Sequence, residues 1–242
     1  MLAAAAQIDR AQIRAFPLFE KMSESVFEAM IAEAVLRRYS AGQSAFEQGE
    51  EAREFFVLTE GRLKVTQLTE DGHQVMIRIV TPGDLFGIAK VLRRPDYPGT
   101  ATAAVDSAAL AWPMCHWSRF IESHAPLAVS AMQTVGQRLQ ESHERLREMA
   151  TEEVERRVAH TVLRLVQQSG CKEPGGIRID FPISKQDIAE MSGTTLHTVS
   201  RILTSWVAKG LVEGGRQKLL VRDPHSLMLL ADSHPQDACP QE

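Results

Sequence analysis

The sequence has no long hydrophobic run and no cysteine framework. No apolar stretch reaches the roughly 18 residues that a membrane-spanning helix needs. The charged residues Asp9 and Arg10 follow too soon after the first residue to leave room for the apolar core of a signal peptide. The three cysteines, Cys115, Cys171 and Cys239, are scattered and show no CxxC spacing. We therefore expect a cytoplasmic protein with reduced thiols, no membrane segment, no disulfide framework and no thiolate metal site.

Motifs of enzymatic catalysis are also missing. The chain has no nucleophile elbow, Walker loop or HExxH motif, and its histidines are not grouped with carboxylates at catalytic spacing. Its 242 residues are long enough for two domains, and 44% apolar with 24% charged residues is ordinary for a globular protein. The sequence thus argues against an enzyme and against a disordered or fibrous chain.

Charge is distributed unevenly along the chain. The whole sequence has a formal charge of −4, but residues 184–222 carry six basic and three acidic side chains, a local charge of +3 that leaves −7 elsewhere. A basic segment in an otherwise acidic chain is a modest indication that the protein binds a polyanion.

The N-terminal part of the sequence has the pattern of a small antiparallel β-domain. Gly61, Gly72 and Gly83 recur at 11-residue intervals between short β-prone runs. A helical pattern, residues 26–34, precedes them. The β-prone runs are 55–58, 63–66 and 75–80.

A long helix with a narrow apolar stripe is predicted for residues 126–150. Its apolar positions alternate steps of three and four, as in a coiled-coil seam, and polar residues flank them. We interpret the stripe as a homodimer interface. The alternative is an amphipathic helix packed on its own β-domain. The stripe consists of Met132, Val135, Leu139, Ser142, Leu146 and Met149.

The C-terminal part, residues 151–231, contains two short helices joined by a glycine. Ser184 and Asp187 form an S-x-x-D capping pattern for the first helix. Gly193 provides a turn without a Cβ, and Thr194 or Thr195 caps the second helix. The predicted fold is therefore α+β: an N-terminal antiparallel β-roll (cupin-like) domain over 1–125, a dimerisation helix over 126–150, a winged helix-turn-helix over 151–231, and a disordered tail over 232–242.

The second helix has one apolar and one polar face. Val199, Ile202, Leu203 and Trp206 follow the spacing of a buried face. The opposite face and the glycine-rich basic turn after it suit contact with the major groove and with phosphates. The alternative is a docking surface for protein, with Arg201 a solvated charge. The candidate DNA-binding residues are Thr195, His197, Thr198, Ser200, Arg201, Thr204, Arg216 and Lys218.

This order of segments resembles the family of the cyclic AMP receptor protein and the FNR oxygen regulator. PGDLFG at 82–87 resembles the family's barrel signature, and HTVSRIL at 197–203 resembles its recognition helix. The resemblance implies a homodimeric transcription regulator, an activator that binds palindromic double-stranded DNA and contacts RNA polymerase. It also implies that Ser200 and Arg201 read the half-site. His197 replaces the family's usual glutamate, as in the nitric-oxide-responsive denitrification regulators of the Nnr and Dnr type.

The resemblance also bears on the signal that the β-domain senses. Where nucleotide-binding members carry a glutamate and an Arg-Ser pair, this chain has Ile88 and Gly99, so a buried cyclic phosphate would lack a cation. An FNR-type iron–sulfur cluster requires a set of N-terminal cysteines, and no cysteine precedes Cys115 in this chain. These features argue against cyclic AMP and against the cluster.

Haem stays a candidate cofactor, since one histidine in an apolar cavity suffices for ligation. His73 and His143 are the candidate ligands. The simpler interpretation is that His73 is a turn residue and that His143 is a solvated residue beside the apolar stripe of the long helix. A protein with no ligand at all, controlled by its abundance, is a further alternative. A second class of function is a haem- or metabolite-binding sensor that acts through protein contacts.

Overall fold

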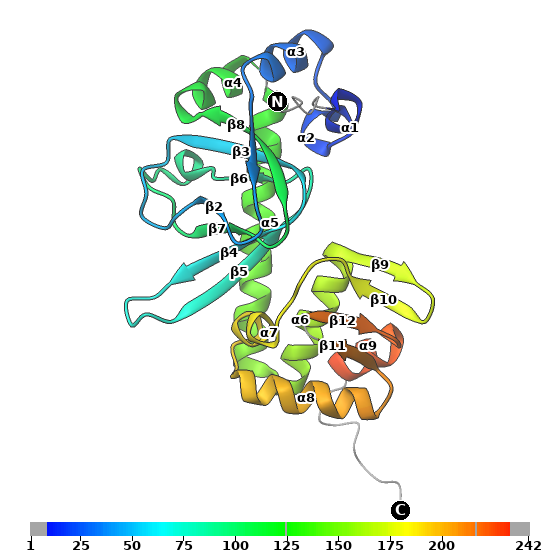
Figure 1. The fold of residues 1–242 in the computed structure, drawn as a ribbon. Helices are drawn as coiled ribbons and strands as arrows, with labels where there is room; N and C mark the ends of the chain where they lie inside the picture. The colour runs from blue at the N-terminus through cyan, green and yellow to red at the C-terminus, as the bar shows by residue number, and fades with distance from the viewer. Residues whose placement is uncertain (1–8, 124, 216, 233–242) are drawn as a thin grey trace, which may run out of the picture. The chain divides into compact units, whose positions relative to one another are not determined.

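The computed structural model describes residues 9–123, 125–215 and 217–232. The chain divides into two compact units, one formed by residues up to 73 and 77–139, the other by 74–76 and the residues from 140 onward. The division falls inside the long helix α5 (Ala125–Thr151). The predicted fold is confirmed: an antiparallel β-domain, a long helix and a helix-turn-helix domain follow one another (Figure 1).

The N-terminal unit consists of two four-stranded antiparallel sheets with helices before and after them. The strand orders are β1-β8-β3-β6 and β2-β7-β4-β5. Gly61, Gly72 and Gly83 lie at three turns between strands with positive φ, as their spacing predicts. The elements are α1 (Arg10–Arg14), α2 (Pro17–Glu20), α3 (Glu24–Ala32), β1 (Val35–Tyr39), β2 (Ser44–Phe46), β3 (Glu54–Glu60), β4 (Leu63–Leu68), β5 (Gln74–Val80), β6 (Leu85–Phe86), η1 (Ala89–Leu92), β7 (Thr100–Ala103), β8 (Ser107–Pro113), η2 (Met114–His116) and α4 (Trp117–Ser123).

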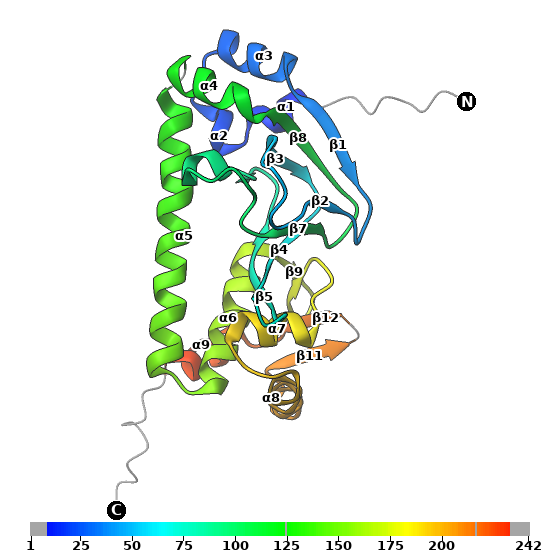
Figure 2. The same ribbon diagram turned by 90° about the vertical axis from the view of Figure 1, so that its left-hand side faces the viewer.

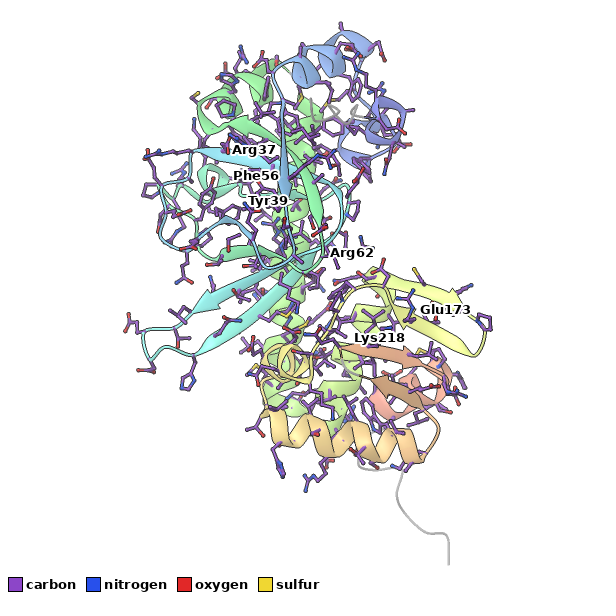
Figure 3. The ribbon with its side chains drawn as sticks, in the orientation of Figure 1. Arg37, Tyr39, Phe56, Arg62, Glu173 and Lys218 are labelled. Carbon is purple, nitrogen blue, oxygen red and sulfur yellow. The ribbon has the colours of Figure 1, made fainter. Side chains whose placement is uncertain are left out.

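Aromatic side chains fill the space between the two sheets. Phe46 stacks on Tyr97 with ring centroids 3.9 Å apart, and Phe56 stacks on Phe86 at 5.0 Å. Figure 3 shows Phe56 within the β-domain. Such pairs add to the free energy gained from burying the rings. The interior of the β-domain is therefore largely filled by the protein's own side chains.

Helix α5 presents two different faces. Leu127 and Ala131 are buried in the core of the N-terminal unit, and this part of α5 runs along the β-domain (Figure 2). Val135, predicted as a stripe residue, instead packs partly buried against that core, because it lies one helical turn beyond Ala131 on the same face. The other apolar members of the stripe are the exposed ones: Met132, Leu139, Leu146 and Met149 are 56% to 67% exposed.

The C-terminal part of α5 is fixed to α6 by buried charge. Nη1 and Nη2 of Arg164 donate to the two carboxylate oxygens of Glu148, at 2.5 Å and 3.1 Å, and the side chain of Glu148 is 7% exposed. Burial, followed by the positive charge of Arg164, lowers the pKa of the nearby Arg145. Removing one partner of such a pair would leave a buried charge uncompensated.

Over the described residues, the C-terminal unit contains the end of α5, the helices α6 to α9 and an antiparallel sheet with the strand order β11-β12-β10-β9. The strand β9 was not predicted, because its residues are all exposed and show no apolar alternation. β10 ends at Ile179, and the buried Phe181 lies beyond it. The elements are α6 (Val154–Ser169), β9 (Gly170–Glu173), β10 (Gly176–Ile179), α7 (Lys185–Ser192), α8 (Leu196–Ala208), β11 (Val212–Gly215), β12 (Lys218–Val221) and α9 (Pro224–Asp232).

Two further expectations concern the ends of the chain and the membrane. Apart from Asp232, at the end of α9, the predicted tail lies outside the described residues. Across the described ranges, no helix combines the length and apolarity that crossing a bilayer requires.

Candidate nucleic-acid interface

The start of α7 is fixed by the predicted capping box. The backbone N–H of Asp187 donates to Ser184 Oγ at 3.0 Å, and the backbone N–H of Ser184 donates to Asp187 Oδ2 at 2.7 Å. Two of the backbone donors at this helix end are thereby satisfied. The helix then buries Ile188 and Ala189.

The turn between α7 and α8 requires a glycine. Gly193 ends α7 in the left-handed region, with φ of 63°. A Cβ at this position would lie 2.9 Å from Cε of Met149, so the terminal methyl of that side chain occupies the space. Arg157 holds the turn from the other side, since it donates to the carbonyls of Ser192 at 3.1 Å and Gly193 at 3.3 Å.

The apolar face of α8 is anchored in the core of the C-terminal unit. Val199 and Trp206 are fully buried, and Ile202 and Leu203 are nearly so. The indole N–H of Trp206 donates to Oε1 of Glu155 at 2.8 Å, which satisfies the polar atom of this side chain. The opposite face of α8 is therefore held outward by a rigid support.

The predicted DNA-binding side chains on α8 divide into two groups. Thr195 is the N-cap and accepts from the backbone N–H of Thr198 at 3.2 Å, so both threonines shape the start of the helix. His197, Arg201 and Thr204 are exposed on the outer face. Within the described part of the chain, no carboxylate pairs with Arg201.

Lys185 is a member of this surface that the sequence analysis did not select. Its ammonium group donates to Ser200 Oγ at 2.9 Å, from α7 to α8. Ser200 is half-buried and so less accessible than the residues beside it. The basic residue at the start of α7, directly after the Ser184 cap, was the only sequence signal for this contact.

The wing is the hairpin of β11 and β12. Gly215 pairs with Lys218, which is exposed on β12 (Figure 3). Arg216 lies outside the described residues. Arg222 forms an ion pair with Glu213 across the hairpin, so these two charges compensate each other. The formal charge of +3 for residues 184–222 already includes this pair and is therefore unchanged by it.

A groove of about 430 Å³ separates the wing from α7 and α8. Lys185 and Lys218 line it, together with Thr204, Gln217 and the backbone of Gly214 and Gly215. Two ammonium groups and a glycine backbone beside an exposed arginine suit the contact of a nucleic-acid phosphate.

The β-domain contains a second, smaller cavity of about 70 Å³. Ile88 and Gly99, the residues that replace the family's acidic and basic groups, both line it. Ile88 is 3% exposed and also belongs to the core. A Cβ on Gly99 would lie 2.7 Å from the carbonyl oxygen of Thr66, so a side chain at position 99 would require the backbone to shift.

The expectation that this site lacks positive charge is wrong. Arg78 of β5 and Arg138 of α5 both line the cavity. Arg78 lies two residues before the buried Val80, and Arg138 lies on the α5 face that carries Ala131 and Val135. Each arginine is thus in phase with core positions of its own element. The sequence argument missed them because it considered only the loop that resembles the nucleotide-binding cassette.

The two candidate haem ligands lie elsewhere. His73 is exposed at the turn between β4 and β5, where its backbone exchanges hydrogen bonds with Thr69. His143 is exposed on α5. Neither lines the cavity of the β-domain.

Comparison with protein families gives the same division of the chain. Residues 36–124 match the model of the cyclic nucleotide-binding domain, and residues 156–230 match that of the Crp-like helix-turn-helix domain. The two matches define the class: a transcription regulator with a sensor domain of the cyclic-nucleotide-binding type and a DNA-binding domain, which is not an enzyme. Because the matches together span more than half of the chain, in this order, the chain belongs to the Crp/Fnr family.

The relatives are distant but cover most of the chain. A CRP-like cAMP-activated global transcriptional regulator of Mycobacterium tuberculosis is 21% identical over 87% of this chain and 94% of its own length. The nitrogen fixation regulation protein FixK of Bradyrhizobium diazoefficiens is 26% identical over 80% of each chain. The solved structure of FixK2 from Bradyrhizobium japonicum has a TM-score of 0.72 at 21% identity and covers 83% of this chain and 98% of its own, which supports the fold.

We predict that Gly193→Ala destabilises the C-terminal unit. The left-handed conformation costs a residue with a Cβ roughly 1–2 kcal/mol, whereas the contact with Met149 is relieved by a shift of the end of that flexible, exposed side chain. Chemical denaturation followed by circular dichroism measures the change. Adding Met149→Ala should recover little of the lost stability, because the left-handed conformation remains. Gly214→Ala is the matched control, because a Cβ there meets no atom within 4 Å. Equal stability of Gly193→Ala and Gly214→Ala would contradict the account.

Proposed function

We propose that this protein is a homodimeric, sequence-specific DNA-binding regulator, an activator controlled by a signal at its N-terminal domain. The observation that carries the proposal is the pair of faces on α8: Trp206 and its neighbours are buried, while His197, Arg201 and Thr204 face outward beside two lysines. An outward polar face on a rigidly anchored helix is suited to reading base edges in the major groove.

Within this proposal each group has a distinct role. Arg201 presents a planar guanidinium that can donate two hydrogen bonds to O6 and N7 of a guanine. Lys185 and Lys218, on the two sides of the groove, neutralise phosphates and set the register of the protein on the duplex. His197 and Thr204 flank Arg201 on the same exposed face and contact the neighbouring base pairs.

The exposed stripe on α5 supports the homodimer. Met132, Leu139, Leu146 and Met149 leave more than half of each side chain exposed along one helix. A coiled-coil pairing of two copies would bury these side chains. Two-fold symmetry then places two α8 helices on half-sites about 34 Å apart, which requires a palindromic site. Activation in this arrangement involves contact with RNA polymerase.

The alternative is a sensor that acts through protein contacts and uses the helix-turn-helix as a docking surface. It differs in its expected DNA binding, which would be weak, salt-sensitive and without sequence preference. The exposed Arg201 and the lysine-lined groove favour the DNA-binding regulator.

The similarity of the recognition helix around His197 to denitrification regulators is what supports a nitric oxide signal through haem. The described residues do not fit haem well. The cavity of about 70 Å³ is far below the roughly 300–1,000 Å³ of ordinary ligand pockets, and His73 and His143 lie outside its lining. No step of the proposed function is therefore assigned to haem.

We predict that substitutions of Arg201 and Lys218 affect DNA binding differently, because Arg201 reads a base and Lys218 contacts a phosphate. Arg201→Ala should weaken binding to a palindromic TTG–CAA-type site by about 1–3 kcal/mol and relax the preference at one base pair. Lys218→Ala should instead weaken binding to all sequences alike and reduce the salt slope by about one. Fluorescence anisotropy with single-base variants, at several salt concentrations, measures both. If Arg201→Ala retained the parent's full sequence preference, the assigned reading role would be incorrect.

We predict that charge in the exposed stripe disrupts the dimer. Leu139→Glu combined with Leu146→Glu places two carboxylates per helix in the proposed seam, so the protein should become monomeric and lose affinity for the palindrome. Gln140→Glu, on the same helix outside the stripe, should leave both properties unchanged. Sedimentation velocity gives the oligomeric state. A double variant that remained dimeric would show that the stripe is not the interface.

We predict that haem reconstitution under anaerobic conditions gives no stoichiometric Soret band, since neither candidate histidine lies at the cavity. Absorption spectra before and after nitric oxide test this. A one-to-one Soret band that shifts with nitric oxide and raises DNA affinity would instead establish the haem signal and direct mutagenesis to His73 and His143.

A further inference from the structure

The exposed face of α5 has the seven-residue repeat of a coiled-coil seam. Met132, Leu139 and Leu146 recur at intervals of seven, as d positions do, and each leaves more than half of its side chain exposed. A seam also needs a second line of residues, the a positions, three or four places from each d position. Two lines have this spacing, one on each side of the d positions, and the structure distinguishes them.

The first line, which contains Val135, is partly used within the chain itself. Val135 packs partly buried against the core of the N-terminal unit. Met149 belongs to the same line, and its terminal methyl occupies the place beside Gly193 that a Cβ would need, so this side chain lies against the turn between α7 and α8. Ser142, between them, is exposed. A second copy thus finds two members of this line already packed.

The second line is uncovered over the described residues. Val129 is 47% exposed, and Gly136, His143 and Ala150 are exposed as well. A Cβ on Gly136 would meet no atom within 4 Å, so the space beside it is open. None of the described residues forms a hydrogen bond or an ion pair with the imidazole of His143. This line therefore provides the available a positions, and it brings a histidine into the seam.

The seam places His143 among uncharged side chains and a second imidazole. In a parallel two-fold pair, the side chain at position 143 fits between positions 139, 142, 143 and 146 of the second copy. In this sequence these positions are Leu139, Ser142, His143 and Leu146. Arg147, one turn further along α5, flanks the seam, and Glu144 lies about 100° further round the helix. A protonated imidazole would therefore face a like charge, with no carboxylate in the seam to compensate it.

We infer that two copies of the chain pair along Met132, Gly136, Leu139, His143 and Leu146, and that protonation of the two facing His143 imidazoles weakens this pairing. A second copy is the partner because each d residue of the repeat meets the same residue across a two-fold axis. Two neutral imidazoles fit between leucines, whereas two charged ones repel each other and lose hydration. The inference rests on the proposed homodimer and names how its association is regulated.

The direction of the pH dependence follows from proton binding. Burial beside a like charge disfavours the charged imidazole in the dimer, so two separate chains bind more protons than the dimer does. Association is therefore strongest above the range in which imidazoles gain their proton, and it weakens as the pH falls from about 7 to about 6. Binding to a palindrome weakens with it, because that site requires both copies.

The dissociation constant of the full-length dimer, measured without DNA by sedimentation equilibrium at about pH 8 and about pH 5.5, tests the inference. The parent's constant should rise at least about tenfold at the lower pH. His143→Leu should associate equally well at both values, because leucine fits the seam and carries no charge. His143→Lys should associate weakly at both, because lysine is charged throughout this range. His225→Gln, which removes an exposed histidine of α9, should keep the parent's pH dependence.

The outcomes distinguish the inference from the proposed function. Circular dichroism at both pH values establishes that each variant is folded. A His143→Leu variant with the parent's pH dependence, or a His143→Lys variant that dimerises as tightly as the parent at about pH 8, would overturn the inference. If the parent is dimeric with the same constant at both pH values, only this inference fails. If the parent is monomeric at both, the homodimer of the proposed function fails, and the inference fails with it.

Discussion

The two-sided packing of α5 is the constraint on which the rest of the structure depends. Leu127 and Ala131 fix one face to the β-domain, and Arg138 continues that face into the cavity. The other face leaves Met132, Leu139 and Leu146 uncovered. A single helix therefore carries both a wall of the β-domain cavity and an uncovered apolar surface.

The helix-turn-helix follows the same division into a fixed and a free face. Trp206 is fully buried and bonded to Glu155, and Arg157 holds the carbonyls of the turn, so the orientation of α8 is set from within the domain. Arg201, Lys185 and Lys218 are exposed basic residues of this surface, whereas Arg222 is compensated by Glu213. The rigid support of α8 reduces the ordering that the helix itself must undergo on binding.

The sequence predicted elements with strong local signals. The capping box of Ser184 and Asp187, the left-handed Gly193 and the buried face around Trp206 are local features, and all three are confirmed. The exposed strand β9 has no such signal. The cavity arginines come together only in the tertiary structure, because Arg78 and Arg138 are 60 positions apart in the sequence. The spacing of each arginine from the buried residues of its own element was visible in the sequence. Only the tertiary structure shows that the two side chains line one cavity.

The most direct test of the central claim is selection of binding sites from a randomised DNA library by the full-length protein. The account predicts an enriched sequence with two-fold symmetry, in which the half-site centres are about one helical turn, 34 Å, apart. Enrichment of an asymmetric single site would contradict the dimeric arrangement built on α5. No enrichment at all, with binding that only falls with salt, would contradict the reading of bases by α8.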